Sequence, residues 1–184
     1  MLIPLGFLAS SGGGVETDYE LIETYVLGSA QANVTFSSLG TYSSTYKHLQ
    51  IRFTARSAVS GAEDTIYARF NSDTGANYSA HQLYGTGSSV LSAGYANLTY
   101  AFCGTPSGNT ATANAFGAGV IDILDPYSTT KNKTTRSLTG QVGASIKLWS
   151  GNWRNTASVT SILLAAENGN LMTGSRFSLY GIKG

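Results

Sequence analysis

Hydrophobic and polar residues alternate along several short segments of this chain. In KHLQIRFTARS, every second residue from 49 to 55 is apolar, and the residues between them are polar. A period of two places the apolar side chains on one face of a strand, so this segment predicts a strand with one buried face. The apolar set is Leu49, Ile51, Phe53 and Ala55, and the polar set is Gln50, Arg52, Thr54 and Arg56.

The same alternation recurs elsewhere, and no window shows the i, i+3, i+4 spacing of an amphipathic helix. It places Ile66, Ala68 and Phe70 on one face in DTIYARFN, and Phe177, Leu179 and Gly181 on one face in SRFSLYGIKG. Further strand candidates are YELIETYVLG, NVTF, HQLYG, NLTYAFC, FGAGVIDIL, ASIKLWSG and SVTSILLA, separated by turn-forming runs such as SDTG, GTGSS and NGNLMTG. This pattern predicts an all-β fold, a single antiparallel β-sandwich that is jelly-roll-like.

The N-terminal segment MLIPLGFLASSGGGVE differs from the rest of the chain. A secretory signal begins with basic residues, and this segment holds no Lys or Arg. Its apolar run is also far shorter than the roughly 20 residues of a membrane span. Two interpretations remain, a strand packed on its own domain or an extended apolar arm that docks on a neighbouring subunit. We favour the arm, with residues 1–14 as the arm and its Ser/Gly hinge (10–14) and residues 15–184 as the sandwich domain. The predicted partner-binding residues are Leu2, Ile3, Leu5, Phe7 and Leu8.

The composition limits the kinds of partner. Charged residues make up 11% of the chain and the net charge is +1, whereas roughly 25% of an ordinary soluble domain is charged. No Lys/Arg cluster offers a phosphate-binding footprint, so we expect no nucleic acid partner. Because the apolar run at the N-terminus is too short for a membrane span, we also expect no membrane insertion. A weakly charged surface gives a free monomer little protection against association, which favours a subunit of a larger assembly.

Few residues are candidates for chemistry. Cys103 lies in the apolar run YAFCG, which predicts a buried, inert thiol. His48 and His81 have no cysteine or carboxylate at ligand spacing, and no G-x-S-x-G elbow is present. We therefore predict no catalytic, cofactor-binding or metal-binding residues, no cofactor, and a protein that is not an enzyme.

Three further positions leave alternatives open. NSDTGANY places Asn71, Asp73 and Asn77 around Gly75, which could be a cation site but more simply predicts a structural turn. Asp122 lies in an apolar run and should pair with an arginine or with backbone N–H groups, because an isolated buried charge is costly. In LWSGNW, Trp149 and Trp153 are candidates either for the core or for surface recognition of a partner such as a sugar.

Several stretches, taken in order, resemble a family of small β-rich virion structural proteins of tailed bacteriophages of the aquatic type. They are LIPLGFLASSG, YELIET, TYKHLQIR, FNSDTGANYSAH, FGAGVIDILD, TTKNKTTRSLTG, LWSGNW and FSLYGIKG. The resemblance implies a non-enzymatic component of the virion surface, with other tail or capsid proteins as partners.

We favour a tail-associated appendage (fibre or baseplate) that contributes to host attachment. The alternatives are a capsid decoration (cement) protein and a carbohydrate-binding module that binds a host surface glycan. Proteins of the first two kinds are commonly homo-oligomers, so we expect a homotrimer.

Overall fold

The computed structural model describes residues 17–184, which form two antiparallel β-sheets packed face to face. The larger sheet holds eight strands in the order β1 (Tyr19–Val26), β12 (Arg176–Ile182), β3 (His48–Ala55), β8 (Gly117–Leu124), β9 (Lys133–Gly140), β10 (Ile146–Trp153), β5 (Tyr78–Gly85) and β6 (Val90–Leu98). The smaller sheet holds β2 (Asn33–Phe36), β11 (Ile162–Ala166), β4 (Ile66–Phe70) and β7 (Ala101–Gly104). A single 3₁₀ turn, η1 (Leu39–Tyr42), is the only helical element in this part of the chain.

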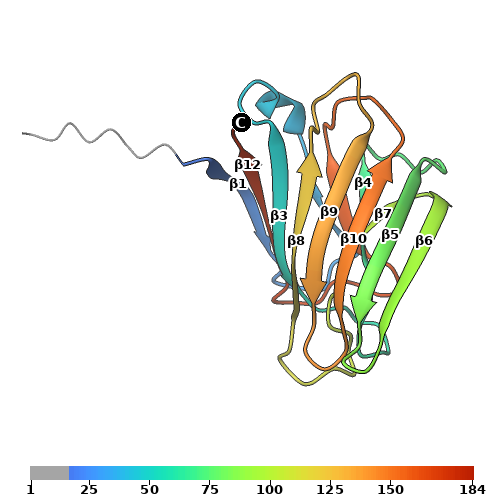
Figure 1. Cartoon of the computed structure of the whole chain (residues 1–184). Helices are drawn as coiled ribbons and strands as arrows, with labels where there is room; N and C mark the ends of the chain where they lie inside the picture. The colour runs from blue at the N-terminus through green and yellow to red at the C-terminus, as the bar shows by residue number, and fades with distance from the viewer. Residues whose placement is uncertain (1–16) are drawn as a thin grey trace, which may run out of the picture.

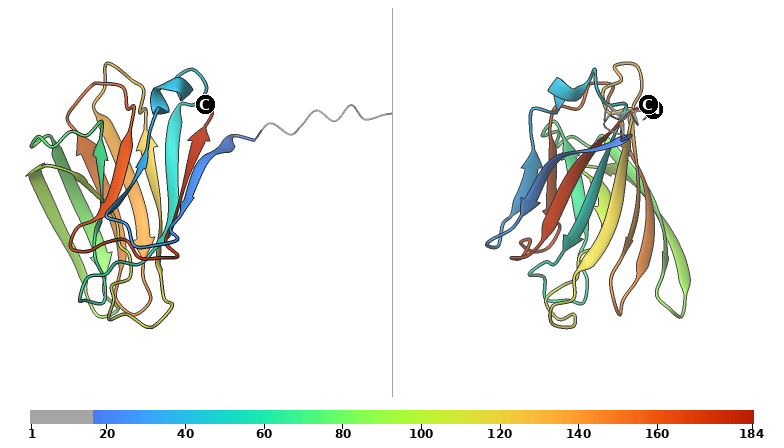
Figure 2. Two further views of the ribbon diagram at one scale, coloured as in Figure 1. Left: turned by 180° about the vertical axis from the view of Figure 1, so that it is seen from behind. Right: turned by 90° about the vertical axis from the view of Figure 1, so that its left-hand side faces the viewer.

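The chain passes repeatedly from one sheet to the other, since β1 to β5 alternate between the two sheets. The larger sheet faces the viewer in Figure 1, and the smaller sheet lies in front in the view from behind (Figure 2). The all-β, jelly-roll-like sandwich predicted from the sequence is therefore confirmed. The predicted arm and hinge (1–14) lie outside the described residues and stay a prediction.

The core between the sheets follows the alternation seen in the sequence. The predicted apolar faces of β3, β4 and β12 all point inward, so these three predictions are confirmed. Aromatic rings fill the centre, where Trp153 lies 5.5 Å from Phe70 and 6.2 Å from Tyr78 between ring centroids. The single cysteine, Cys103, is also fully buried, as predicted.

The two tryptophans do not form a surface. Trp149 is 4% exposed and Trp153 is 1% exposed, so the possible surface-recognition role predicted for them is wrong. The physical reason is their spacing: residues four apart in a strand lie on the same face, and this face of β10 points into the sandwich. Trp149 packs against Phe102, with ring centroids 5.3 Å apart, and against Tyr95.

Strand β9 has the reverse of the usual pattern. Its polar residues point inward, while Leu138 points to solvent. The ammonium group of Lys133 donates hydrogen bonds to the carbonyls of Ser128 and Lys131, and Thr139 donates to the hydroxyl of Thr105. These contacts satisfy the Lys133 ammonium and the Thr139 hydroxyl, so the two ends of the strand accept polar side chains on its inner face. The inward set is Lys133, Thr135, Ser137 and Thr139.

Candidate interaction surface

The outer face of the larger sheet carries a row of exposed apolar side chains. Val120 of β8 lies opposite Leu138 of β9, Leu138 lies opposite Leu148 of β10, and Leu148 lies opposite Leu83 of β5. Side chains that lie directly opposite on neighbouring strands contact one another. These four residues, which we call the apolar strip, therefore form one continuous band across four strands. The three leucines are each about half exposed, at 46–54%.

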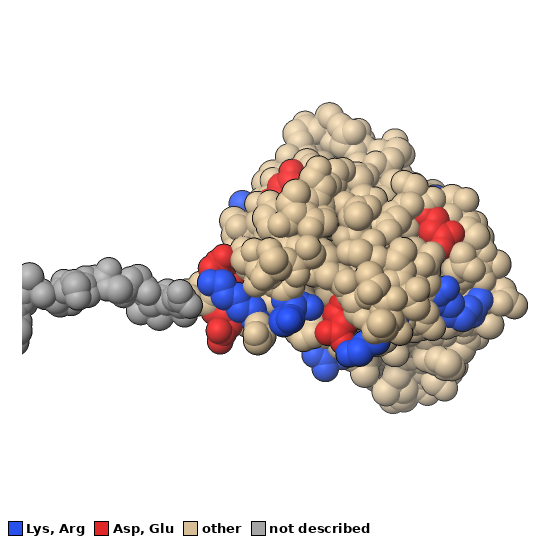
Figure 3. Space-filling model, turned by 90° about the horizontal axis from the view of Figure 1, so that it is seen from above, with Lys and Arg blue, Asp and Glu red and all other residues tan. Residues whose placement is uncertain are grey.

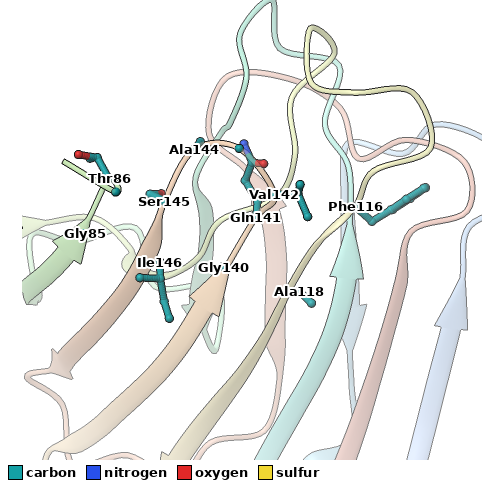
Figure 4. A pocket seen from close by; sticks show the side chains of 12 residues that line it. Gly85, Thr86, Phe116, Ala118, Gly140, Gln141, Val142, Ala144, Ser145 and Ile146 are labelled. Carbon is teal, nitrogen blue, oxygen red and sulfur yellow. The ribbon is translucent and has the colours of Figure 1, made fainter. Parts of the chain in front are cut away.

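The next row of residues, toward the tips of the β5–β6 and β9–β10 hairpins, extends this apolar surface. Ile146 stands between Gly140 and Gly85 on its two neighbouring strands, and Val90 follows on β6. The glycines leave space around Ile146, and an open hollow of about 630 Å³ lies here, between the tips of the two hairpins and Phe116 (Figure 4). None of the residues that line the hollow carries an ionisable side chain. The hollow is therefore suited to apolar contact and not to acid–base chemistry.

A polar network lies beside the apolar strip on the same face. The guanidinium of Arg136 donates to Oδ2 of Asp122 at 2.9 and 3.1 Å, and the side-chain amide of Gln50 donates to Oδ1 at 2.8 Å. Arg52 donates to Gln50 and lies over the ring of Tyr180, 4.8 Å from its centroid. The predicted pairing of Asp122 with an arginine is thus confirmed.

Charged groups are sparse elsewhere too. Seen from above, acidic and basic side chains form small groups of both signs, and most of the visible surface carries neither (Figure 3). No helix among residues 17–184 is long and apolar enough to cross a membrane.

The NSDTG segment is a structural turn, as predicted. Oδ1 of Asp73 accepts the backbone N–H of Gly75 at 2.7 Å, and Oδ2 accepts the indole N–H of Trp153 at 2.7 Å and the amide of Asn77 at 2.9 Å. Burial works to raise the pKa of Asp73, but these hydrogen bonds outweigh it and hold the pKa below its usual value. Because N–H donors occupy both carboxylate oxygens, the group ties the turn to the core and has little left for a cation.

The histidines have separate surroundings. Nδ1 of His48 accepts the backbone N–H of Asp125 at 3.0 Å, and the Asp125 carboxylate also binds Lys131. His81 is exposed on the outer face, where its ring lies over Gly94. The Cys103 thiol is enclosed in the core, and burial raises its pKa. Within residues 17–184, no three His, Cys, Asp or Glu side chains gather in a group that could hold a metal ion.

Arg56 is a structural residue that the sequence did not reveal. Its guanidinium is buried and donates four hydrogen bonds of 2.8–3.0 Å to backbone carbonyls of the β7–β8 loop. The acceptors belong to Asn109, Ala111, Thr112 and Ala115. Phe116, the last residue of this loop, forms one wall of the hollow (Figure 4). Arg56 therefore holds in place the loop that borders the apolar surface.

Comparisons with known proteins assign no family. No family model and no curated protein matches the chain. Among solved structures, a variant of an alginate lyase in complex with an alginate tetrasaccharide is similar over 87% of this chain and 80% of the lyase chain, with 10% sequence identity and a TM-score of 0.28. A likeness this low carries no argument about activity. The fold and the outer face by themselves define a β-sandwich protein with a broad exposed apolar surface.

Proposed function

We propose that this protein is a non-enzymatic structural subunit of a tailed-bacteriophage particle, a surface component of the tail that contributes to host attachment. The observation that carries the proposal is the apolar strip, which the described part of the chain leaves uncovered. The resemblance of the sequence to small virion structural proteins supports the same function. In the proposal, the strip packs against another protein of the particle.

The chemistry of the strip specifies the surface that would cover it. A soluble monomer rarely exposes a contiguous apolar patch of more than a few hundred Å², and larger patches mark interaction sites. Burying such a patch contributes about 25 cal/mol per Å². Since the strip holds no charged group and Arg136 beside it already pairs with Asp122, the matching partner surface is apolar and broad. A second β-sheet face, packed about 10 Å away, has this shape.

The alternative functions differ in their support. The carbohydrate-binding alternative relied on exposed tryptophans, and both tryptophans are buried. A capsid decoration protein would use the same apolar face, so labelling this protein on whole particles and imaging them distinguishes the tail from the capsid.

Leu148→Glu is expected to reduce incorporation into particles at least tenfold, because it places a carboxylate in the middle of the strip, where docking would bury it. Particles assembled with the variant are purified, and the amount of this protein per particle is measured. Leu148 is half exposed, so circular dichroism and the melting temperature should stay close to those of the wild type. The matched control is Leu21→Glu, an exposed leucine on β1 of the same sheet but outside the strip, which should incorporate normally.

The outcomes separate the two parts of this proposal. Normal incorporation of Leu148→Glu would show that the strip is not the docking surface. Absence of the wild-type protein from purified particles would contradict the structural role itself.

Deleting residues 1–11 is expected to leave a folded protein that no longer incorporates into particles. The five apolar side chains of the predicted arm would each contribute about 1.5–3 kcal/mol on full burial in a partner, and several arms on one oligomer would bind together with a high effective concentration. Circular dichroism checks the fold, and the protein content of purified particles checks incorporation. If the truncated protein unfolds, the segment belongs to its own domain, and normal incorporation would place the anchor elsewhere.

A further inference from the structure

The two edges of the larger sheet differ in how they are protected against pairing with another strand. At one edge, β1 carries Glu20 and Glu23 and has a register shift between Leu21 and Glu23. At the other edge, β6 reads VLSAGYANL and holds no charged residue and no proline (Figure 1). Natural sheets block exposed edges with charges, prolines and bulges, because an open edge is a template for another strand. By this criterion β1 is blocked, whereas β6 is open from Val90 to Tyr95, ahead of its own register shift.

The first six residues of β6 form a regular edge. The β5–β6 ladder is continuous from Val90 to Tyr95, and its register shifts only beyond that point. The backbone N–H of Thr86 donates to the carbonyl of Ser89 at 3.0 Å, and Gly87, with φ of 88°, occupies the turn between them. In an antiparallel ladder, hydrogen-bonded and non-hydrogen-bonded pairs alternate. Counting from the Thr86–Ser89 pair, Val90, Ser92 and Gly94 direct their backbone N–H and C=O groups away from β5.

Two apolar side chains at this edge are also uncovered. Val90 is 75% exposed on the outer face of the sheet, and Leu91 is 46% exposed on the opposite face. A strand added at this edge would cover both side chains and would bond the outward backbone groups. Because Val90 follows Ile146 and Gly85 in the same row, an added strand would also continue the apolar outer face.

We propose that β6 of one copy pairs antiparallel with β6 of a second copy, centred on Ser92. In this register Val90 lies opposite Gly94 of the second copy, and Leu91 lies opposite Ala93 of the second copy. Each pair matches a large side chain with a small one on the same face of the sheet. The three outward residues then form about six backbone hydrogen bonds, two for each hydrogen-bonded pair.

A second copy fits this edge better than an unrelated strand would, since the uncharged segment is complementary to itself in side-chain size at the Val90–Gly94 and Leu91–Ala93 pairs. The contact is two-fold, with the same surface used on both copies. It therefore joins copies in pairs, in contrast to the trimer expected from the sequence. The proposal depends on the β6 edge alone and does not rest on the proposed virion function.

Disulfide trapping between single-cysteine variants tests the register. Leu91→Cys and Ala93→Cys would face each other as a non-hydrogen-bonded pair with Cα atoms about 4.5 Å apart, which is within the range of a disulfide. Cys103 is the single cysteine of the chain and is buried, so it should form few disulfides with the introduced cysteines. An equal mixture of the two variants under mild oxidation should form several-fold more disulfide-linked dimer than either variant alone. Tyr19→Cys mixed with Leu21→Cys, on the blocked edge β1, is the matched control and should show no such gain.

Sedimentation of the uncrosslinked protein provides the second measurement. The wild type should form a species of twice the 19.3-kDa chain mass as its concentration rises. Ser92→Lys, which places two ammonium groups beside the two-fold axis, should shift it to the monomer; Ser92 is exposed, so the melting temperature of the monomer should change little. A wild type that stays monomeric or forms a trimer would overturn the proposal, as would a mixture that crosslinks no more than its separate components.

Discussion

Arg56→Met is expected to lower the free energy of unfolding by about 3 kcal/mol or more, because hydrogen bonds to a charged group contribute about 1.5–3 kcal/mol each. The variant keeps most of the apolar stem but removes the donors for four carbonyls of the β7–β8 loop. Arg56→Lys should fall between the wild type and Arg56→Met, since one ammonium group has three donors and cannot span all four carbonyls. Denaturant unfolding followed by circular dichroism measures the change.

Two further readouts make the Arg56 prediction specific. Limited proteolysis should cut the variant within residues 109–115 faster than the wild type, because the loop loses the four hydrogen bonds that the guanidinium donates to it. The matched control is Arg176→Met, an exposed arginine at the start of β12, which should change stability by no more than about 0.5 kcal/mol. A loss below about 1 kcal/mol for Arg56→Met, near the net value of one ordinary hydrogen bond, would mean that the loop supports itself.

Asp73→Ala is expected to lower the free energy of unfolding by about 2–3 kcal/mol, the cost of leaving buried donors without an acceptor. The indole N–H of Trp153 suffers most, because Trp153 is almost fully buried and its acceptor is Oδ2 of Asp73. Asp73→Asn should lose less, since its carbonyl oxygen still accepts N–H groups at one of the two carboxylate positions, whereas its NH₂ group cannot accept at the other. Unfolding curves of the two variants beside the exposed control Asp18→Ala test this order. Equal stability of Asp73→Ala and the wild type would contradict it.

The effect of Asp73 should also depend on pH in one direction. The hydrogen bonds in the folded protein hold the pKa of this carboxyl below the ordinary value of an aspartate, so the ionised form stabilises the fold above that ordinary value. This contribution is lost as the pH falls through the lowered folded pKa. The difference in stability between the wild type and Asp73→Ala should therefore be constant near neutral pH and should shrink below about pH 4. A difference that grows on acidification would contradict this explanation.

In the strands with alternating residues, the local pattern was sufficient to predict which face is buried. In β3, β4 and β12, one face is apolar because it packs on the other sheet, and the period of two records that burial directly. The Asp73 turn was also predictable, since Asn, Asp and Gly form turns through short-range hydrogen bonds within a few residues. These features depend on neighbours along the chain or on which face is buried.

In strands β9 and β10, the local pattern was not sufficient to predict which face points inward. In β10, apolar and amphipathic residues occupy both faces, and hydropathy alone would place Ile146 and Leu148 inside. The structure instead turns Trp149 and Lys147 inward, where Lys147 pairs with Glu63 at 2.6 Å. In β9, the inward hydroxyl of Thr139 donates to Thr105, 34 residues away in the sequence. The inner face of such a strand is decided by contacts that only the folded chain makes.

The sequence by itself determined the fold class, the buried cysteine and the Asp73 turn, because each depends on periodicity or on residues close together in the chain. Its resemblance to virion proteins, the arm at residues 1–14 and the expected trimer stay predictions. Only the tertiary structure decided the candidate surfaces. Leu83, Leu138 and Leu148 come from three strands, and the register between these strands brings them into one apolar strip. The open edge of β6 likewise exists because of the order of strands in the sheet, which no short segment of the sequence specifies.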